Sequence, residues 1–151
     1  MKKKEEKTLL TIDALSILSW IENKDGYISK TKLPIKIMWE IKADIAKLAE
    51  IRARYNDFES EINSRYMSDE FSYNDEEIDE NGNRTQIRKV KNEYLDQFNS
   101  EKRELLSTEN KIDVSVFDIE DFGDIEIGIH DLNMLGFFIA SIDSKSLIEF
   151  H

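Results

Sequence analysis

Carboxylates that could serve acid–base catalysis are plentiful in this 151-residue chain, with 32 Asp and Glu, but the spacing of its residues matches no known catalytic motif, and we expect these acids to be solvated at the surface. The chain has no cysteine, which excludes thiol catalysis, Cys-ligated zinc and iron–sulfur clusters. His130 lacks a Gly-x-Ser-x-Gly partner motif, so we expect it to help cap a helix, and His151 is the last residue. The five scattered glycines form no phosphate-binding loop. We therefore predict no catalytic, cofactor or metal site, and a protein that is not an enzyme.

A cluster of acidic residues precedes the sequence Asn81-Gly82-Asn83. Its members are Asp75, Glu76, Glu77, Asp79 and Glu80. An EF-hand alignment that puts Gly82 at position 6 puts Arg88 at position 12, where calcium needs a bidentate acid. We therefore predict a solvated turn rather than a calcium loop, and we take the five acids as candidate partner-binding residues.

Charge is distributed unevenly along the chain. The net charge is −11, and residues 1–55 carry +4 whereas residues 56–151 carry −15. This excess of acid argues against direct binding of nucleic acid, which needs clustered Lys and Arg. It is compatible with a basic partner, or with a surface that imitates a polyanion.

The sequence gives no sign of export or of a membrane span. The charged start, Met1 to Lys7, precedes a segment interrupted by Asp13, Ser16 and Ser19. The longest apolar run, Leu132 to Ala140, is too short to cross a bilayer. We expect a cytoplasmic protein without a membrane partner.

The two tryptophans lie on predicted helical faces. Core packing is the expected role of Trp20 and Trp39, because tryptophan is highly buried on average. Aromatic side chains also anchor many interfaces. Trp39 is therefore a candidate partner-binding residue.

Apolar periodicity predicts most of the secondary structure. Spacings of three and four predict an N-terminal helix over 8–23 and a long helix that begins near Pro34 and carries a stripe from Met38 to Tyr66. A second stripe follows over 90–107, so we expect residues 33–107 to form a long antiparallel helical hairpin. Its acidic tip, 68–89, forms either a small β-hairpin or a mobile loop. The long stripe exceeds what the return helix can cover, so we expect another chain to cover the remainder.

Alternating apolar residues follow after Asn110. Two strands, Ile112–Val116 and Ile125–Ile129, are expected to form a β-hairpin, and Asp131 is expected to cap a last helix that ends near Ile142. Residues 111–142 thus form a β-hairpin plus helix. The predicted fold is α+β, mainly α, in a single domain over 1–151.

Several of these features occur together in one known group of proteins. They are Leu33-Pro34 before the long helix, the helix end at Tyr66, the acidic turn from Asp79 to Asn83, and a return helix with Phe98 and Glu104-Leu105-Leu106. Residues 33–116 thereby resemble a loosely defined family of small tailed-phage proteins of unknown function. The resemblance implies a phage or prophage origin and a role through protein contacts, and it transfers no catalytic residue.

The main hypothesis is a non-enzymatic, phage-type protein-interaction or assembly module that acts through its helical hairpin. It would bind a host or phage protein, or a second copy in a homo-oligomer, in the host cell cytoplasm. The alternative is an acidic inhibitor that mimics nucleic acid and blocks a host defence or DNA/RNA-binding protein. A small hydrolase or nuclease is a third hypothesis, and a small ligand held between subunits is a fourth.

Overall fold

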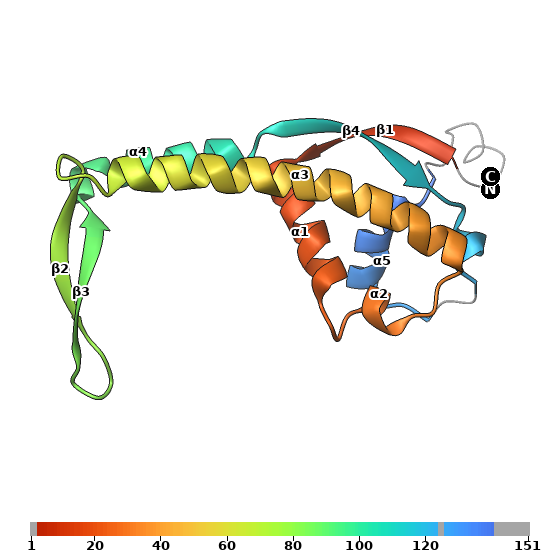
Figure 1. The fold of residues 1–151 in the computed structure, drawn as a ribbon, viewed down its shortest axis with the longest axis horizontal. Coiled ribbons are helices and arrows are strands. Elements are labelled where there is room, and N and C mark those ends of the chain that lie inside the picture. The colour runs from red at the N-terminus through yellow and green to blue at the C-terminus, as the bar shows by residue number, and fades with distance from the viewer. Residues whose placement is uncertain (1–2, 124–125, 141–151) are drawn as a thin grey trace. The chain divides into compact units, whose positions relative to one another are not determined.

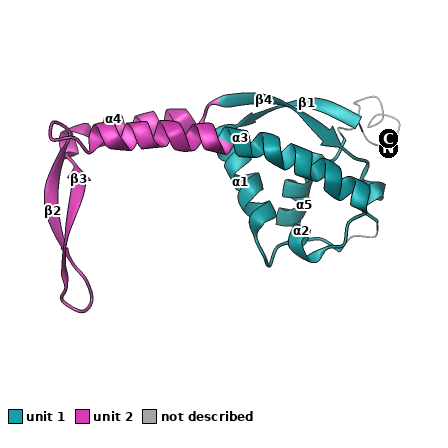
Figure 2. Ribbon diagram, in the orientation of Figure 1, with its two compact units in different colours: residues 1–51, 109–151 teal, residues 52–108 magenta. Residues whose placement is uncertain are grey.

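The computed structural model describes residues 3–123 and 126–140, and it is an α+β fold with about 57% helix and 24% strand (Figure 1). The chain divides into two compact units (Figure 2). Unit 1 comprises residues 1–51 and 109–151, and unit 2 comprises residues 52–108. The 32-residue helix α3 (Ile35–Tyr66) contributes its first half to unit 1 and its second half to unit 2.

Unit 1 contains a two-stranded antiparallel sheet and several helices. Strand β1 (Lys3–Leu10) pairs with β4 (Glu109–Val116), from Lys3 opposite Val116 to Leu10 opposite Glu109. The helical elements are α1 (Thr11–Glu22), α2 (Tyr27–Lys30), the start of α3, η1 (Ile119–Phe122), α5 (Ile129–Leu135) and η2 (Gly136–Phe138). Their apolar side chains form one core, whose most deeply buried members include Ala14, Leu18, Ile41, Leu48, Leu135 and Phe138.

Unit 2 contains the end of α3, a β-hairpin and a second helix. Strands β2 (Ser72–Ile78) and β3 (Arg84–Val90) pair antiparallel, and α4 (Asn92–Leu106) follows. A small core of Ile62, Tyr66 and Val90 lies beside the partly buried Phe71, Tyr94, Phe98 and Leu105. Because an isolated two-stranded hairpin is marginally stable in water, this aromatic core is what anchors β2 and β3.

The predicted long antiparallel helical hairpin over 33–107 is wrong. The structure has one long helix, α3, whereas α4 has 15 residues and the segment between them is a sheet. Of the stripe on α3, Ile41, Leu48 and Ile51 are buried in the core of unit 1, whereas Phe58 is 54% exposed, so coverage of the remainder by another chain stays a prediction. Periodicity correctly predicted helix α3. It did not predict which elements pack against α3, because those elements lie far away in the sequence.

The predicted C-terminal β-hairpin is also wrong. Strand β4 pairs with β1, which the sequence analysis did not predict as a strand. Residues 126–128 form neither helix nor strand, Ile129 begins α5, and Ile125 lies outside the described residues. Helix α5 ends at Leu135 and is followed by η2, and the predicted helix end at Ile142 again lies outside the described residues.

The end of the N-terminal helix was predicted more accurately than its start. Helix α1 begins at Thr11 rather than at Thr8, because residues 3–10 form β1. It ends at Glu22, close to the predicted end, where the turn at Gly26 follows.

Candidate interaction site

Trp39 lies on the outward face of α3 in unit 1. The carbonyl of Pro34 accepts a hydrogen bond from the N–H of Met38 at 3.1 Å, at the start of the helix. Ile37 and Ile41 point into the core, and a residue two positions away from each faces the opposite side of a helix. Trp39 is accordingly 74% exposed and Ile35 is 83% exposed. Core packing, the expected role of Trp39, is therefore wrong.

A pocket of about 340 Å³ opens beside Trp39. Its lining residues are Ile35, Lys36, Trp39, Glu40 and Phe117. The aromatic and aliphatic side chains supply apolar walls, and Lys36 and Glu40 supply one charge of each sign. A large exposed aromatic side chain beside an apolar recess is a feature of many interaction surfaces.

Trp20 has the buried position that the sequence analysis expected. Its indole Nε1 donates a hydrogen bond to Oδ1 of Asp131 at 2.7 Å, and its ring stacks on Tyr27 with centroids 6.3 Å apart. The bond joins α1 to α5. Asp131 is the third residue of α5, inside the helix rather than before it. The prediction that Asp131 caps this helix is therefore wrong.

A buried polar cluster lies beneath the outward face of α3. Oδ1 of Asp44 accepts the backbone N–H of Ser115 at 2.9 Å, and Oε2 of Glu40 accepts the hydroxyl of Ser115 at 3.1 Å. Lys47 Nζ donates to the carbonyl of Asp113, and Lys7 Nζ donates to the carbonyl of Phe137 at 2.7 Å. These bonds attach α3 to β4 and attach β1 to η2.

The environment of this cluster changes two pKa values. Burial raises the pKa of Asp44 from 3.8 to about 6, against the opposing effects of the Ser115 hydrogen bond and of Lys47. Burial also lowers the pKa of Lys7. Oδ2 of Asp44 has no hydrogen-bond partner among residues 3–123 and 126–140. The sequence analysis missed Asp44, although its spacing from Ile41 and Leu48 places it on the buried face.

The acidic cluster lies partly in β2, with Asp75, Glu76 and Glu77, and partly in the turn that follows, with Asp79 and Glu80, and two of its five carboxylates form ion pairs within the hairpin. Asp75 forms an ion pair with Lys89 at 3.0 Å, and Glu76 forms one with Arg84 at 3.8 Å. Hydrogen bonding from the Glu76 N–H and then from Lys89 lowers the pKa of Asp75. Residues 72–90 contain five acids and three bases, so the hairpin carries a net charge of −2.

Asp79 organises the turn between β2 and β3. Its Oδ1 accepts the N–H groups of Asn81 at 2.9 Å and of Asn83 at 2.8 Å, which lowers the pKa of Asp79. Gly82 has φ of +80°, a conformation that glycine adopts without strain. Of the two forms that the sequence left open for the tip, the structure has the β-hairpin.

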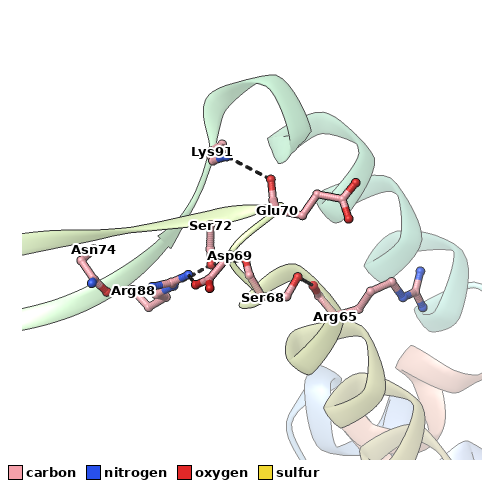
Figure 3. Close-up of polar contacts among 8 residues, drawn as sticks. All are labelled: Arg65, Ser68, Asp69, Glu70, Ser72, Asn74, Arg88 and Lys91. Carbon is pink, nitrogen blue, oxygen red and sulfur yellow. Dashed lines mark hydrogen bonds and ion pairs between the residues drawn. The ribbon is translucent and has the colours of Figure 1, made fainter.

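Arg88 holds the base of the hairpin (Figure 3). Its guanidinium donates to Ser72 Oγ at 2.7 Å, to Asn74 Oδ1 at 3.0 Å and to Asp69 Oδ1 at 2.5 Å. Lys91 Nζ donates to the carbonyl of Glu70 at 3.0 Å. These bonds join β3 and the residue after it to β2 and to the segment between α3 and β2.

His130 is the second residue of α5 and lines a pocket of about 480 Å³ together with Ser16, Ser19 and Asp131. The N-cap residue of α5 is Gly128, and the start of this helix has no capping hydrogen bond from a side chain. The expected capping role of His130 is therefore wrong. Within the described residues, no group of three or more His, Asp or Glu side chains is placed to hold a metal ion.

The fold and its outward surface define an α+β protein of two units with an exposed tryptophan on a long helix. Across the part of the chain that the structure describes, no helix is both long and apolar enough to cross a bilayer. No family model, no curated protein and no solved structure matches the chain. The resemblance of residues 33–116 to small tailed-phage proteins therefore stays a prediction.

Proposed function

We propose that this chain is a non-enzymatic protein-interaction module that binds its partner through the outward face of α3 around Trp39. The observation that carries the proposal is the exposure of Trp39 and Ile35 beside an apolar pocket. Covering a tryptophan removes on the order of 200 Å² of surface from water, which corresponds to about 5 kcal/mol before the costs of association. This surface replaces the helical hairpin as the proposed contact.

The proposal includes a biological setting. The resemblance to tailed-phage proteins suggests an assembly component encoded by a phage or prophage and acting in the cytoplasm of the host cell. Gene neighbourhood tests this setting, because an assembly component is expected among head and tail genes.

Replacing Trp39 with alanine is expected to weaken binding at least tenfold, because truncation of a central aromatic anchor commonly removes more than about 1.4 kcal/mol. The wild-type chain and the Trp39→Ala variant serve as baits in a lysate of the cells that produce the chain. Any protein recovered is then titrated against both baits, and light scattering measures self-association. Phe58→Ala, which truncates an exposed aromatic residue in unit 2, is the matched control.

Two results would contradict the proposal. One is a wild-type chain that stays monomeric and retains no protein. The other is equal binding by the wild-type and Trp39→Ala baits.

The alternative proposal is inhibition by nucleic-acid mimicry through the acidic hairpin. The contacts of three of these acids argue against mimicry, because Asp75 and Glu76 form ion pairs with bases of the same hairpin and Asp79 Oδ1 accepts backbone N–H groups of the turn. Changing Asp75, Glu76, Glu77, Asp79 and Glu80 to their amides is expected to alter partner affinity by less than about threefold, since exposed charges contribute little to a contact made elsewhere. Titration at two salt concentrations measures this. Abolished binding, together with strong salt dependence in the wild type, would favour mimicry.

A further inference from the structure

The outward face of α3 within unit 1 has a pattern of its own. Its exposed residues are Ile35, Lys36, Trp39, Lys42, Ala43, Ala46 and Glu50. Ile35, Trp39, Ala43 and Ala46 follow one another at spacings of four, four and three, so they form one stripe along the helix. The opposite side of the same segment is buried in the core of unit 1.

Side-chain size is distributed unevenly along this stripe. The bulky residues Ile35 and Trp39 lie at its beginning, and the small residues Ala43 and Ala46 lie at its centre and end. A surface that is raised at one end and flat at the other fits a copy of itself when the two run antiparallel. In that arrangement each Trp39 lies over the alanines of the other copy, whereas a parallel arrangement would oppose Trp39 to Trp39.

Charge follows the same symmetry. Lys36 and Glu50 both lie seven residues from Ala43, one before it and one after it. A two-fold axis at Ala43 therefore brings Lys36 of each copy opposite Glu50 of the other. Lys42 lies at the edge of the stripe, where its ammonium group reaches solvent. Ala43 is also the midpoint of Ile35–Ile51, the segment of α3 that belongs to unit 1.

We propose that the partner of this face is a second copy of the chain, and that α3 packs antiparallel on α3 of that copy about a two-fold axis at Ala43. This inference rests on the proposed function, and it names the partner. Such an isologous contact needs a self-complementary surface. The order of large and small residues, and the paired positions of Lys36 and Glu50, supply that complementarity. The contact spans ~25 Å of helix.

Charge exchange tests the arrangement directly. Sedimentation of the full chain measures the dissociation constant of the dimer over about 1 to 100 µM, a range chosen because one helix pair is smaller than a standard interface. Lys36→Glu and Glu50→Lys are each expected to raise that constant about tenfold, because each creates two like-charge contacts. The double variant is expected to return to within about threefold of the wild type. A double variant that is as weak as either single variant would overturn the antiparallel register.

Cross-linking tests the position of the axis. The chain has no cysteine, so Ala43→Cys introduces one thiol per copy. Two such thiols meet at the two-fold axis, and oxidation is expected to convert most of the protein into a covalent dimer. Ala53→Cys, an exposed position further along α3, is the control and is expected to cross-link at least tenfold more slowly. Equal rates for the two variants would place the axis elsewhere.

The outcomes separate this inference from the proposed function. The wild-type chain could be monomeric at every concentration and bind a different protein that the Trp39→Ala variant no longer binds. That result would overturn the dimer and leave the interaction function in place. A dimer that is abolished by Trp39→Ala and cross-linked through position 43 would support both. A dimer that is unaffected by changes at Trp39, Lys36 and Glu50 would overturn the α3 contact, and it would also contradict the proposed function if the wild-type and Trp39→Ala baits retain every other protein equally.

Discussion

Replacing Tyr66 with alanine is expected to lower the free energy of unfolding of unit 2 by about 3 to 5 kcal/mol, the usual cost of truncating a buried aromatic residue. Tyr66 is 0% exposed. Its ring lies 5.2 Å from that of Phe71 and 5.1 Å from that of Phe98, measured between centroids. The substitution therefore removes the ring contacts with Phe71 and Phe98 from a core that has only a few buried members among the described residues.

Hydrogen exchange of the backbone amides in β2 and β3 measures this effect locally, and thermal unfolding followed by circular dichroism measures it globally. Tyr73→Ala is the matched control, since Tyr73 lies on the exposed part of β2, and it is expected to cost less than about 1 kcal/mol. Equal losses for the two variants would show that Tyr66 does not hold the hairpin in place.

Replacing Asp44 with asparagine is expected to change the pH dependence of stability by about 2 to 3 kcal/mol between about pH 4 and pH 8. Burial raises the pKa of Asp44 from 3.8 to about 6, so the folded state binds this proton more tightly than the unfolded chain does. The stabilising contribution is therefore fully present below about pH 3.8 and is lost as the pH rises through about 6. Asparagine cannot ionise, so the variant gains stability relative to the wild type as the pH rises.

Urea unfolding of both proteins at several pH values gives the free energy of unfolding of each. Subtracting the value of the variant from that of the wild type at each pH cancels the contributions of the other acids. Asp44 is 1% exposed and faces Lys7 on β1, Glu40 and Lys47 on α3, and the backbone of β4. Asp113→Asn, an exposed position of β4, is the control and is expected to change stability by less than about 0.5 kcal/mol. A difference between wild type and Asp44→Asn that does not vary with pH would contradict the raised pKa.

The candidate site was only partly predictable. Trp39 was a candidate partner-binding residue, but its exposure depends on which side of α3 meets the core. Trp39 and Ile41 are both large and apolar, so periodicity alone assigned both to one broad stripe. The acids of the hairpin were also candidates, and their neutralisation depends on cross-strand pairing with Arg84 and Lys89.

Secondary-structure elements that depend on contacts between residues close in the sequence could be predicted. Helical spacing located α1, α3 and α4, and Asn81-Gly82 located the turn between β2 and β3, because each rests on contacts between near neighbours. Pairing of β1 with β4 was not accessible. It joins Lys3 to Val116 across more than a hundred residues, and residues 3–7 are all charged, a composition that resembles a solvated segment.

The sequence by itself determined an acidic α+β chain without thiol chemistry, with its main helices and one tight turn, because composition and local periodicity are properties of the chain alone. Tertiary structure alone decided which partner covers each apolar face. The burial of a side chain depends on the segments packed against it, and here those segments come from distant parts of the chain. This is why Asp44 is buried and Trp39 is exposed on the same helix, five residues apart.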